Sequence, residues 1–183
     1  MSISEIVILH CAPTLAGLKP ASLFTCHKAE YPDLKAELAY LNAQLNSRNI
    51  FFQIVASRPT YDLVMIYEGT LLWNHIQGEG EAEFLRSYGY KLEDLKETLR
   101  QLMVQMQNND FPHEVGIFLG YPLEDVKSFI REGGRNYKDI GYWKVYHNEV
   151  KAHEIFKTYK RCVEFFQKRF HRGVRLEQLV LQP

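Results

Sequence analysis

Side chains that could do chemistry are concentrated in two short segments about a hundred residues apart. The first, residues 10–19, reads HCAPTLAGLK, and the second, residues 111–126, reads FPHEVGIFLGYPLEDV. Each sets thiol, imidazole, carboxylate or ammonium groups beside Pro and Gly, which restrict or extend the backbone conformations available to a loop. We therefore predict that the two segments meet around one pocket, lined by Cys11, His113, Lys19 and Tyr121.

The first hypothesis for this pocket is a cysteine-dependent enzyme. Cys11 would serve as nucleophile if a nearby positive charge lowered its pKa. Adjacent side chains rarely point the same way, so His113 is a better general base than His10, with Glu114 or Asp125 orienting it. This arrangement predicts a hydrolase or transferase that acts on a small molecule. The alternative is a buried structural thiol, because free cysteine is among the most buried residue types.

A metal site is a second hypothesis for the same residues. The side chains of His10, Cys11, His113 and Glu114 offer nitrogen, sulfur and oxygen donors that suit zinc or ferrous iron. None of them has the short spacing of a familiar metal motif. The sequence therefore assigns no metal and no cofactor.

A third hypothesis is a binding site for a flat ligand such as haem or flavin. Tyrosine and tryptophan side chains cluster around the second segment, at Tyr121, Tyr137, Tyr142, Trp143 and Tyr146. Aromatic rings can stack on a planar ligand, although half-buried packing is their commoner role. The residues expected to contact the ligand are His10, Thr14, Lys19, Tyr121, Asp125, Trp143 and Lys144.

Composition limits the class of protein. The chain has 183 residues, of which 46% are hydrophobic, so we expect one domain over residues 1–183. Its 22 basic and 22 acidic side chains cancel, which argues against a nucleic-acid partner. No signal peptide or membrane-spanning run is evident, and three cysteines do not suggest a disulfide framework. We expect a cytoplasmic protein with reduced thiols.

Hydrophobic periodicity predicts the first elements. Residues 33–46 should form a helix capped by Asp33, with leucines on one stripe. Residues 51–56 and 61–67 are β-rich and separated by a turn sequence, which predicts a hairpin. Residues 92–107 carry leucine and methionine at three- and four-residue steps and should form an amphipathic helix.

The second half of the chain alternates in the same way. Residues 115–119 suggest a buried strand, followed by a helix that begins at Pro122 and stops near Gly133. Residues 142–146 suggest a last short strand before a long helix. The fold class predicted is α/β (or α+β): a single-domain sandwich with a mixed sheet of about five short strands and amphipathic helices packed on it.

The long carboxy-terminal helix is predicted to be basic. Its positive side chains are Lys151, Lys157, Lys160, Arg161, Lys168, Arg169, Arg172 and Arg175. Such a patch is most often the solvated face of an amphipathic helix. The alternative is a docking surface for an acidic redox protein such as a flavodoxin.

Three motifs carry a resemblance to a known family. Residues 10–19, residues 111–126 and residues 141–146 (GYWKVY) resemble the bacterial family of domain of unknown function 3793, over nearly the whole chain. The resemblance implies an anaerobic bacterial origin and a context in iron or redox metabolism, but no activity. Relatives are expected to carry a cysteine just before GYWK, where this chain has Asp139 and Ile140. Two hypotheses stay open: the cysteine enzyme, and a protein that binds haem, flavin, iron or a flavodoxin.

Overall fold

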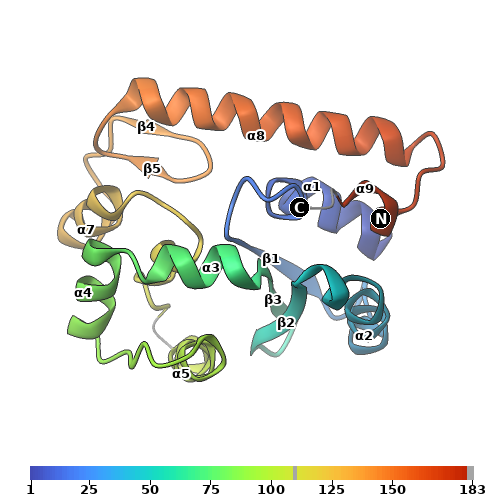
Figure 1. The fold of residues 1–183 in the computed structure, drawn as a ribbon, viewed down its shortest axis with the longest axis horizontal. Coiled ribbons are helices and arrows are strands. Elements are labelled where there is room, and N and C mark those ends of the chain that lie inside the picture. The colour runs from blue at the N-terminus through green and yellow to red at the C-terminus, as the bar shows by residue number, and fades with distance from the viewer. Residues whose placement is uncertain (109–110, 181–183) are drawn as a thin grey trace.

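The computed structural model describes residues 1–108 and 111–180 and centres on a three-stranded antiparallel sheet (Figure 1). The strands are β1 (Ala21–His27), β2 (Ile50–Ser57) and β3 (Tyr61–Glu68), in the order β1-β3-β2. β2 and β3 form the predicted hairpin, and β3 lies between its two partners. Helices cover both faces of this sheet.

The first core lies between the sheet and its amino- and carboxy-terminal helices. Side chains alternate along a strand, and Phe24 and Cys26 of β1 point to this face together with Val64 and Ile66 of β3. The helices on this side are α1 (Ile3–Leu15), α2 (Leu34–Leu45), α8 (Glu149–Phe170) and α9 (Leu176–Leu179). In Figure 1, α8 runs over α1 as an outer layer, and the amino terminus lies near α9.

The second core lies on the opposite face, where Leu23 and Met65 point. Its helices are α3 (Gly69–Ile76), α4 (Glu79–Ser87), α5 (Leu95–Gln107) and the short α6 (Val115–Phe118). Phe118, Leu102 and Leu85 are fully buried there. This face positions the second chemistry-bearing segment.

A third cluster closes one end of the molecule. It joins α7 (Leu123–Glu132) and the hairpin of β4 (Asp139–Ile140) and β5 (Lys144–Val145) to the first half of α8. Trp143, Val145 and Tyr159 form its buried centre. In Figure 1 this part lies beneath the amino-terminal end of α8.

The α/β fold class is confirmed, with four differences in detail. The strands belong to two sheets that are antiparallel throughout, instead of one mixed sheet. The strand predicted at residues 115–119 is helix α6, because a short buried apolar run fits either element. Of residues 142–146, only Lys144–Val145 are extended and paired. Asp33 stands at the start of α2 but makes no capping hydrogen bond with its side chain.

The outer edge of β2 is covered by a side chain from α2. The Asn42 amide donates to the Phe52 carbonyl oxygen at 2.9 Å, and its oxygen accepts from the Phe52 N–H at 2.8 Å. One amide group thereby makes the two hydrogen bonds that a further strand would make at this residue.

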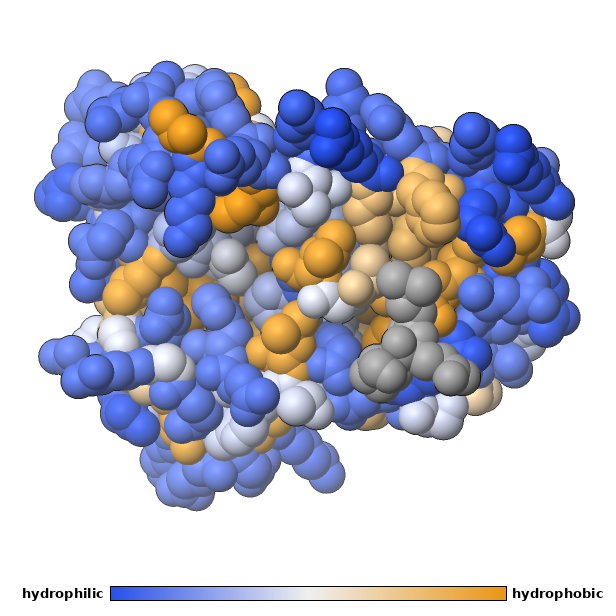
Figure 2. All heavy atoms as spheres, turned by 45° about the horizontal axis from the view of Figure 1, so that its top comes forward, coloured by the Kyte–Doolittle hydropathy of each residue, from blue (hydrophilic) through white to orange (hydrophobic). Residues whose placement is uncertain are grey.

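The surface is polar around α8. Figure 2, which turns the side of the molecule bearing α8 forward, shows hydrophilic side chains over most of this face with apolar patches between them. Among the helices of residues 1–108 and 111–180, none has the length and apolar character needed to cross a membrane.

Candidate functional site: an aromatic pocket beside the sheet

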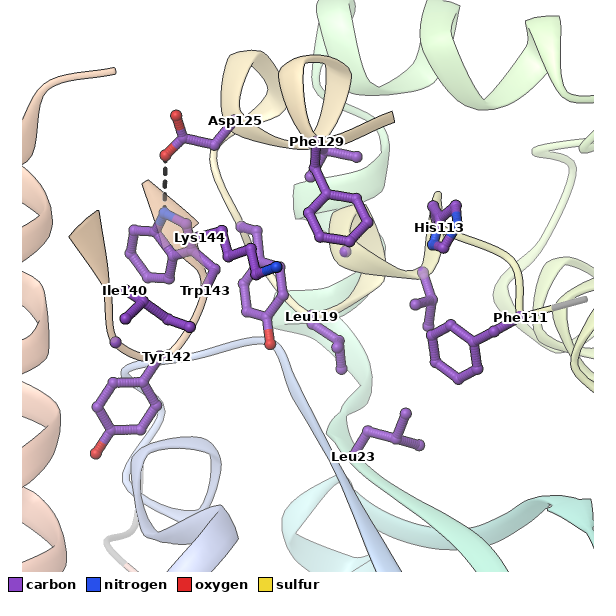
Figure 3. A pocket seen from close by; sticks show the side chains of 15 residues that line it. Leu23, Phe111, His113, Leu119, Asp125, Phe129, Ile140, Tyr142, Trp143 and Lys144 are labelled. Atoms are coloured by element: carbon purple, nitrogen blue, oxygen red, sulfur yellow. Dashed lines mark hydrogen bonds between the residues drawn. The ribbon is translucent and has the colours of Figure 1, made fainter. Parts of the chain in front are cut away.

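A pocket of about 480 Å³ lies where β1, α6, α7 and the β4–β5 hairpin converge (Figure 3). Five of its side chains are aromatic: Phe111, Tyr121, Phe129, Tyr142 and Trp143. Five are aliphatic: Leu23, Val115, Leu119, Val126 and Ile140. Its ionisable side chains, apart from the tyrosines, are His113, Asp125 and Lys144. The pocket therefore combines an apolar wall with few polar groups, as ligand sites commonly do.

A tight turn between α6 and α7 shapes one side of the pocket. Gly120 has a φ of +74°, which disfavours any residue with a Cβ, and a Cβ there would lie 2.6 Å from Cδ of Pro20. The turn sets Tyr121 against the loop before β1, with Lys19 Nζ 5.4 Å from the centre of its ring. The two segments singled out in the sequence thus meet, but through Lys19, Pro20, Gly120 and Tyr121.

Asp125 holds the pocket wall together. Its carboxylate accepts hydrogen bonds from the Trp143 indole N–H at 2.8 Å and from the backbone N–H groups of Tyr146 at 3.0 Å and His147 at 2.8 Å. Asp125 is buried, and Figure 3 shows its carboxylate turned away from the cavity. Its role in the structure is to fasten the β4–β5 hairpin to α7.

The aromatic side chains pack on one another as well as on the cavity. Trp143 lies 5.5 Å from Tyr121 and 4.5 Å from Phe156 of α8, measured between ring centres. His113 meets Phe129 edge to face at 5.2 Å. Such contacts favour fixed ring orientations, so the wall is largely formed before any ligand binds.

Lys144 supplies a positive charge at the pocket. Its Nζ donates to the Gly134 carbonyl oxygen at 2.7 Å and lies over the rings of Phe129, at 5.6 Å, and Tyr137, at 4.8 Å. Within the described residues, no carboxylate forms a salt bridge with it. The ammonium group therefore retains N–H donors for another acceptor.

Cys11 lies outside the pocket. Its thiol is fully buried in the first core, and burial raises its pKa well above the usual range despite the nearby Lys19 and Ser22. The pocket opens on the side of the sheet to which Leu23 points, whereas Phe24 and Cys26 share the face of Cys11. The structure therefore does not bring Cys11 and His113 together.

The other predicted site residues also have partners away from the cavity. His10 is exposed and stacks on Phe24 at 6.3 Å, and Thr14 shares a 2.8 Å hydrogen bond with Ser22. Glu114 is buried and accepts from the Tyr90 hydroxyl at 3.0 Å. His113, Tyr121, Asp125, Trp143 and Lys144 are the predicted site residues that do line the pocket.

Lys19 is buried beneath the pocket wall. Burial lowers its pKa from 10.5 to about 8, and the proximity of Cys11 acts in the opposite direction. No salt bridge joins it to a carboxylate in the described part of the chain. Its ammonium group lies near the Tyr121 ring and Cys11.

The proposed metal ligands are not assembled. Across residues 1–108 and 111–180, no group of three or more His, Cys, Asp or Glu side chains is placed to hold a metal ion. His10 and Cys11 lie on α1, while His113 and Glu114 immediately precede α6.

Several pocket residues were missed by sequence reasoning. Phe129 follows Asp125 by four residues on α7, a spacing that puts both on one helix face and could have indicated it. Leu23 and Ile140 come from other elements, and their proximity depends on how those elements pack. Nothing in local spacing indicates that proximity.

Comparison with known families assigns the chain to one of them. The family model of a protein of unknown function, DUF3793, matches residues 7–180. The chain belongs to the DUF3793 family. This match confirms the resemblance seen in the three motifs, and the part of the chain that matches DUF3793 includes every residue that lines the pocket. No curated protein and no solved structure matches the chain.

Proposed function

We propose that this protein binds a small, flat and largely apolar molecule in the aromatic pocket. The observation that carries the proposal is the convergence of five aromatic side chains from three parts of the chain on one cavity of about 480 Å³. Sites for small ligands typically measure about 300–1,000 Å³ and are walled by apolar and aromatic groups. Planar ligands such as flavins and porphyrins present the matching chemistry.

The chemistry of the wall favours binding over covalent catalysis. The described lining contains no Cys, Ser or Thr that could act as a nucleophile. Asp125 already accepts three hydrogen bonds from the protein, so it is poorly placed to act as a base. The cysteine-dependent hydrolase or transferase has less support, because Cys11 is buried on the opposite face of the sheet.

A matched pair of phenylalanine substitutions tests the binding function. Phe129 lines the pocket, whereas Phe165 lies on α8 and is 51% exposed. Binding of Nile red, FMN and haem would be titrated by fluorescence or absorbance. We expect at least one of them to bind, and Phe129→Ala to weaken that binding about tenfold through loss of a stacking surface, while Phe165→Ala leaves it unchanged.

Two outcomes would contradict this proposal. One is that none of the three molecules binds the folded wild-type protein. The other is that Phe129→Ala, shown to be folded by circular dichroism, binds as tightly as wild type.

The exposed face of α8 favours a second candidate function, docking of an acidic protein. Residues 149–175 carry eight basic and three acidic side chains, whereas the rest of the chain carries 14 basic and 19 acidic ones. Lys157, Lys160, Arg161 and Lys168 are exposed, and none pairs with a carboxylate of the described chain. Phe165 lies exposed among them, with the Arg169 guanidinium 5.6 Å from its ring centre.

Charge reversal tests this docking surface. We expect a flavodoxin to bind the wild-type protein, and Lys160→Glu/Arg161→Glu/Lys168→Glu to slow its association, most strongly at low salt. The control Lys35→Glu/Arg86→Glu/Lys96→Glu reverses three exposed basic side chains on α2, α4 and α5. An association rate unaffected by salt, or equally slowed by both triple variants, would overturn the docking role.

A further inference from the structure

We infer that the ligand of the aromatic pocket carries an anionic group, a carboxylate or phosphate, that binds Nζ of Lys144. This inference rests on the proposed function and specifies the chemical class of ligand. It predicts a molecule with a flat apolar body and one acidic end.

The charges around the pocket favour an anion. Asp125 is the lining carboxylate, and its oxygens are engaged by Trp143, Tyr146 and His147 and turned away from the cavity (Figure 3). Lys144 has no such compensation, since its Nζ meets a neutral carbonyl and two aromatic rings. A ligand carboxylate or phosphate would supply the missing countercharge.

The donors of Lys144 are only partly used. An ammonium group has three N–H donors, and the Gly134 carbonyl oxygen takes one of them at 2.7 Å. The rings of Phe129 and Tyr137 flank the group and stabilise its charge without accepting a conventional hydrogen bond. Donors therefore remain for a ligand oxygen.

The position of the amine also determines how such a ligand would lie. In Figure 3 the Lys144 side chain reaches from β5 into the space between Trp143 and Phe129. Tyr137, beside the amine, is 42% exposed, so this end of the site is close to solvent. An acid bound there stays partly hydrated, which lowers the cost of placing its charge, while the apolar body contacts Phe129, Leu119 and Leu23.

Matched naphthalene compounds test the inference. Isothermal titration calorimetry would compare 2-naphthoate, 2-naphthyl phosphate and the neutral 2-naphthamide. We expect at least one of the anions to bind the wild-type protein about 10- to 100-fold more tightly than the amide, the range given by a charged hydrogen bond. The anion that binds more tightly identifies the acidic group of the ligand.

Variants at position 144 assign the preference to this side chain. Lys144→Met should remove the preference for the anion and leave 2-naphthamide affinity within about twofold, which also shows that the pocket is still formed. Lys144→Arg should keep the preference, as should the control Lys138→Met, which removes an exposed cation from the same region.

The possible results separate the two proposals. Equal affinity of wild type for anions and amide, or a preference that persists in Lys144→Met, would overturn the anionic ligand while the pocket remains a binding site. Failure of all three naphthalene compounds to bind a protein that does bind Nile red, FMN or haem would also overturn the anionic ligand. Failure of Nile red, FMN and haem to bind would overturn the binding function itself.

Discussion

Cys11 and Lys19 are neighbours whose charged forms are both disfavoured by burial. Removal from water penalises a thiolate and an ammonium alike, so the pKa of Cys11 is raised and that of Lys19 falls to about 8. Each group partly offsets the shift of the other, because the two charges attract. The pair is therefore a buried polar feature of the first core, and burial disfavours a reactive thiolate at neutral pH.

Thiol labelling should show the protection of Cys11. With iodoacetamide at pH 8, we expect Cys162, which is half-buried on α8, to react before the fully buried Cys11. Peptide mass spectrometry would follow both sites, and labelling in urea would show that both thiols can react. Faster labelling of Cys11 in the folded protein would revive the nucleophile hypothesis.

The pH dependence of stability should report the buried Lys19. Its pKa is about 8 in the folded protein against 10.5 for the free side chain, so the unfolded chain binds more protons between these values. The contribution of Lys19 to the free energy of unfolding therefore becomes more favourable as the pH rises above 8. We expect Lys19→Met to be more stable than wild type near pH 7, and this difference to shrink by about 1 kcal/mol by pH 9.

Urea unfolding of both proteins from pH 6.5 to 9 measures that difference. Comparing the two curves isolates Lys19, because Cys26, Cys162 and the tyrosines are the same in each. A difference that stays constant or grows with pH would show that Lys19 has an ordinary pKa.

At the scale of single residues, the sequence identified residues in special positions more reliably than it predicted their roles. Three of the residues singled out do occupy special positions. Lys19 and Asp125 are buried polar groups, and Tyr121 forms part of the pocket wall. The predicted pairing of Cys11 with His113 is wrong because Cys11 of α1 is buried on one face of the sheet, whereas His113, just before α6, lines the pocket on the other face. The role of Asp125 could not be predicted, because its carboxylate accepts hydrogen bonds from three donors in residues 143–147 that come together only when the hairpin is folded.

Among the elements, α7 and the β4–β5 hairpin form one structural unit through Asp125. Asp125→Ala would leave the Trp143 indole and two backbone N–H groups without their acceptor. We expect a loss of about 2–4 kcal/mol in the free energy of unfolding, measured in urea, because buried unpaired donors are costly. The control Glu124→Ala removes an exposed neighbour whose partner is Lys127 and should cost less than about 1 kcal/mol.

Equal stability of these two variants would contradict the role assigned to Asp125. If Asp125→Ala is the less stable variant, the pocket should change too, because Trp143 would lose the hydrogen bond that holds it in the wall. Ligand affinity should therefore fall in Asp125→Ala although the Asp125 carboxylate is turned away from the cavity.

Local signals explain which elements were predicted. The β2–β3 hairpin and the helices α2, α5 and α7 depend on near neighbours in the chain, and all were expected. Helix α1 was not expected, although Ser2 and Glu5 form a capping box whose residue spacing can be recognised in the sequence. The sequence of helix α6 predicts a strand, because burial on all sides removes the periodicity that distinguishes a helix from a strand.

The whole molecule is organised around a sheet that both large cores share. β1, β2 and β3 contribute side chains to the first core on one face and to the second on the other. Loss of either core would therefore expose the sheet. We predict that the chain behaves as a single domain with one cooperative unfolding transition.

Two substitutions on opposite faces test this prediction. Leu38→Ala in the first core and Leu102→Ala in the second should each lower stability by about 2–5 kcal/mol. In urea, far-ultraviolet circular dichroism and tryptophan fluorescence should shift together in both variants. Separate transitions, or a shift in only one signal, would indicate two independently folding parts.

Molecular architecture was the part that the sequence predicted least completely. Its composition and element types indicated an α/β protein, and the structure confirms that class. The order of strands and the separation of Cys11 from the pocket follow from contacts between distant segments, such as Pro20 with Gly120. Such contacts produce no periodic pattern of residues by which a single sequence could reveal them.

The amide of Asn42 has a consequence for behaviour in concentrated solution. An unpaired strand edge offers its backbone to other chains, and repeated intermolecular pairing of this kind leads to aggregates. By occupying the N–H and carbonyl groups of Phe52, Asn42 removes an attachment point in the first half of an apolar strand. A single polar side chain on α2 thus occupies a backbone site at which the strand of another copy could otherwise pair.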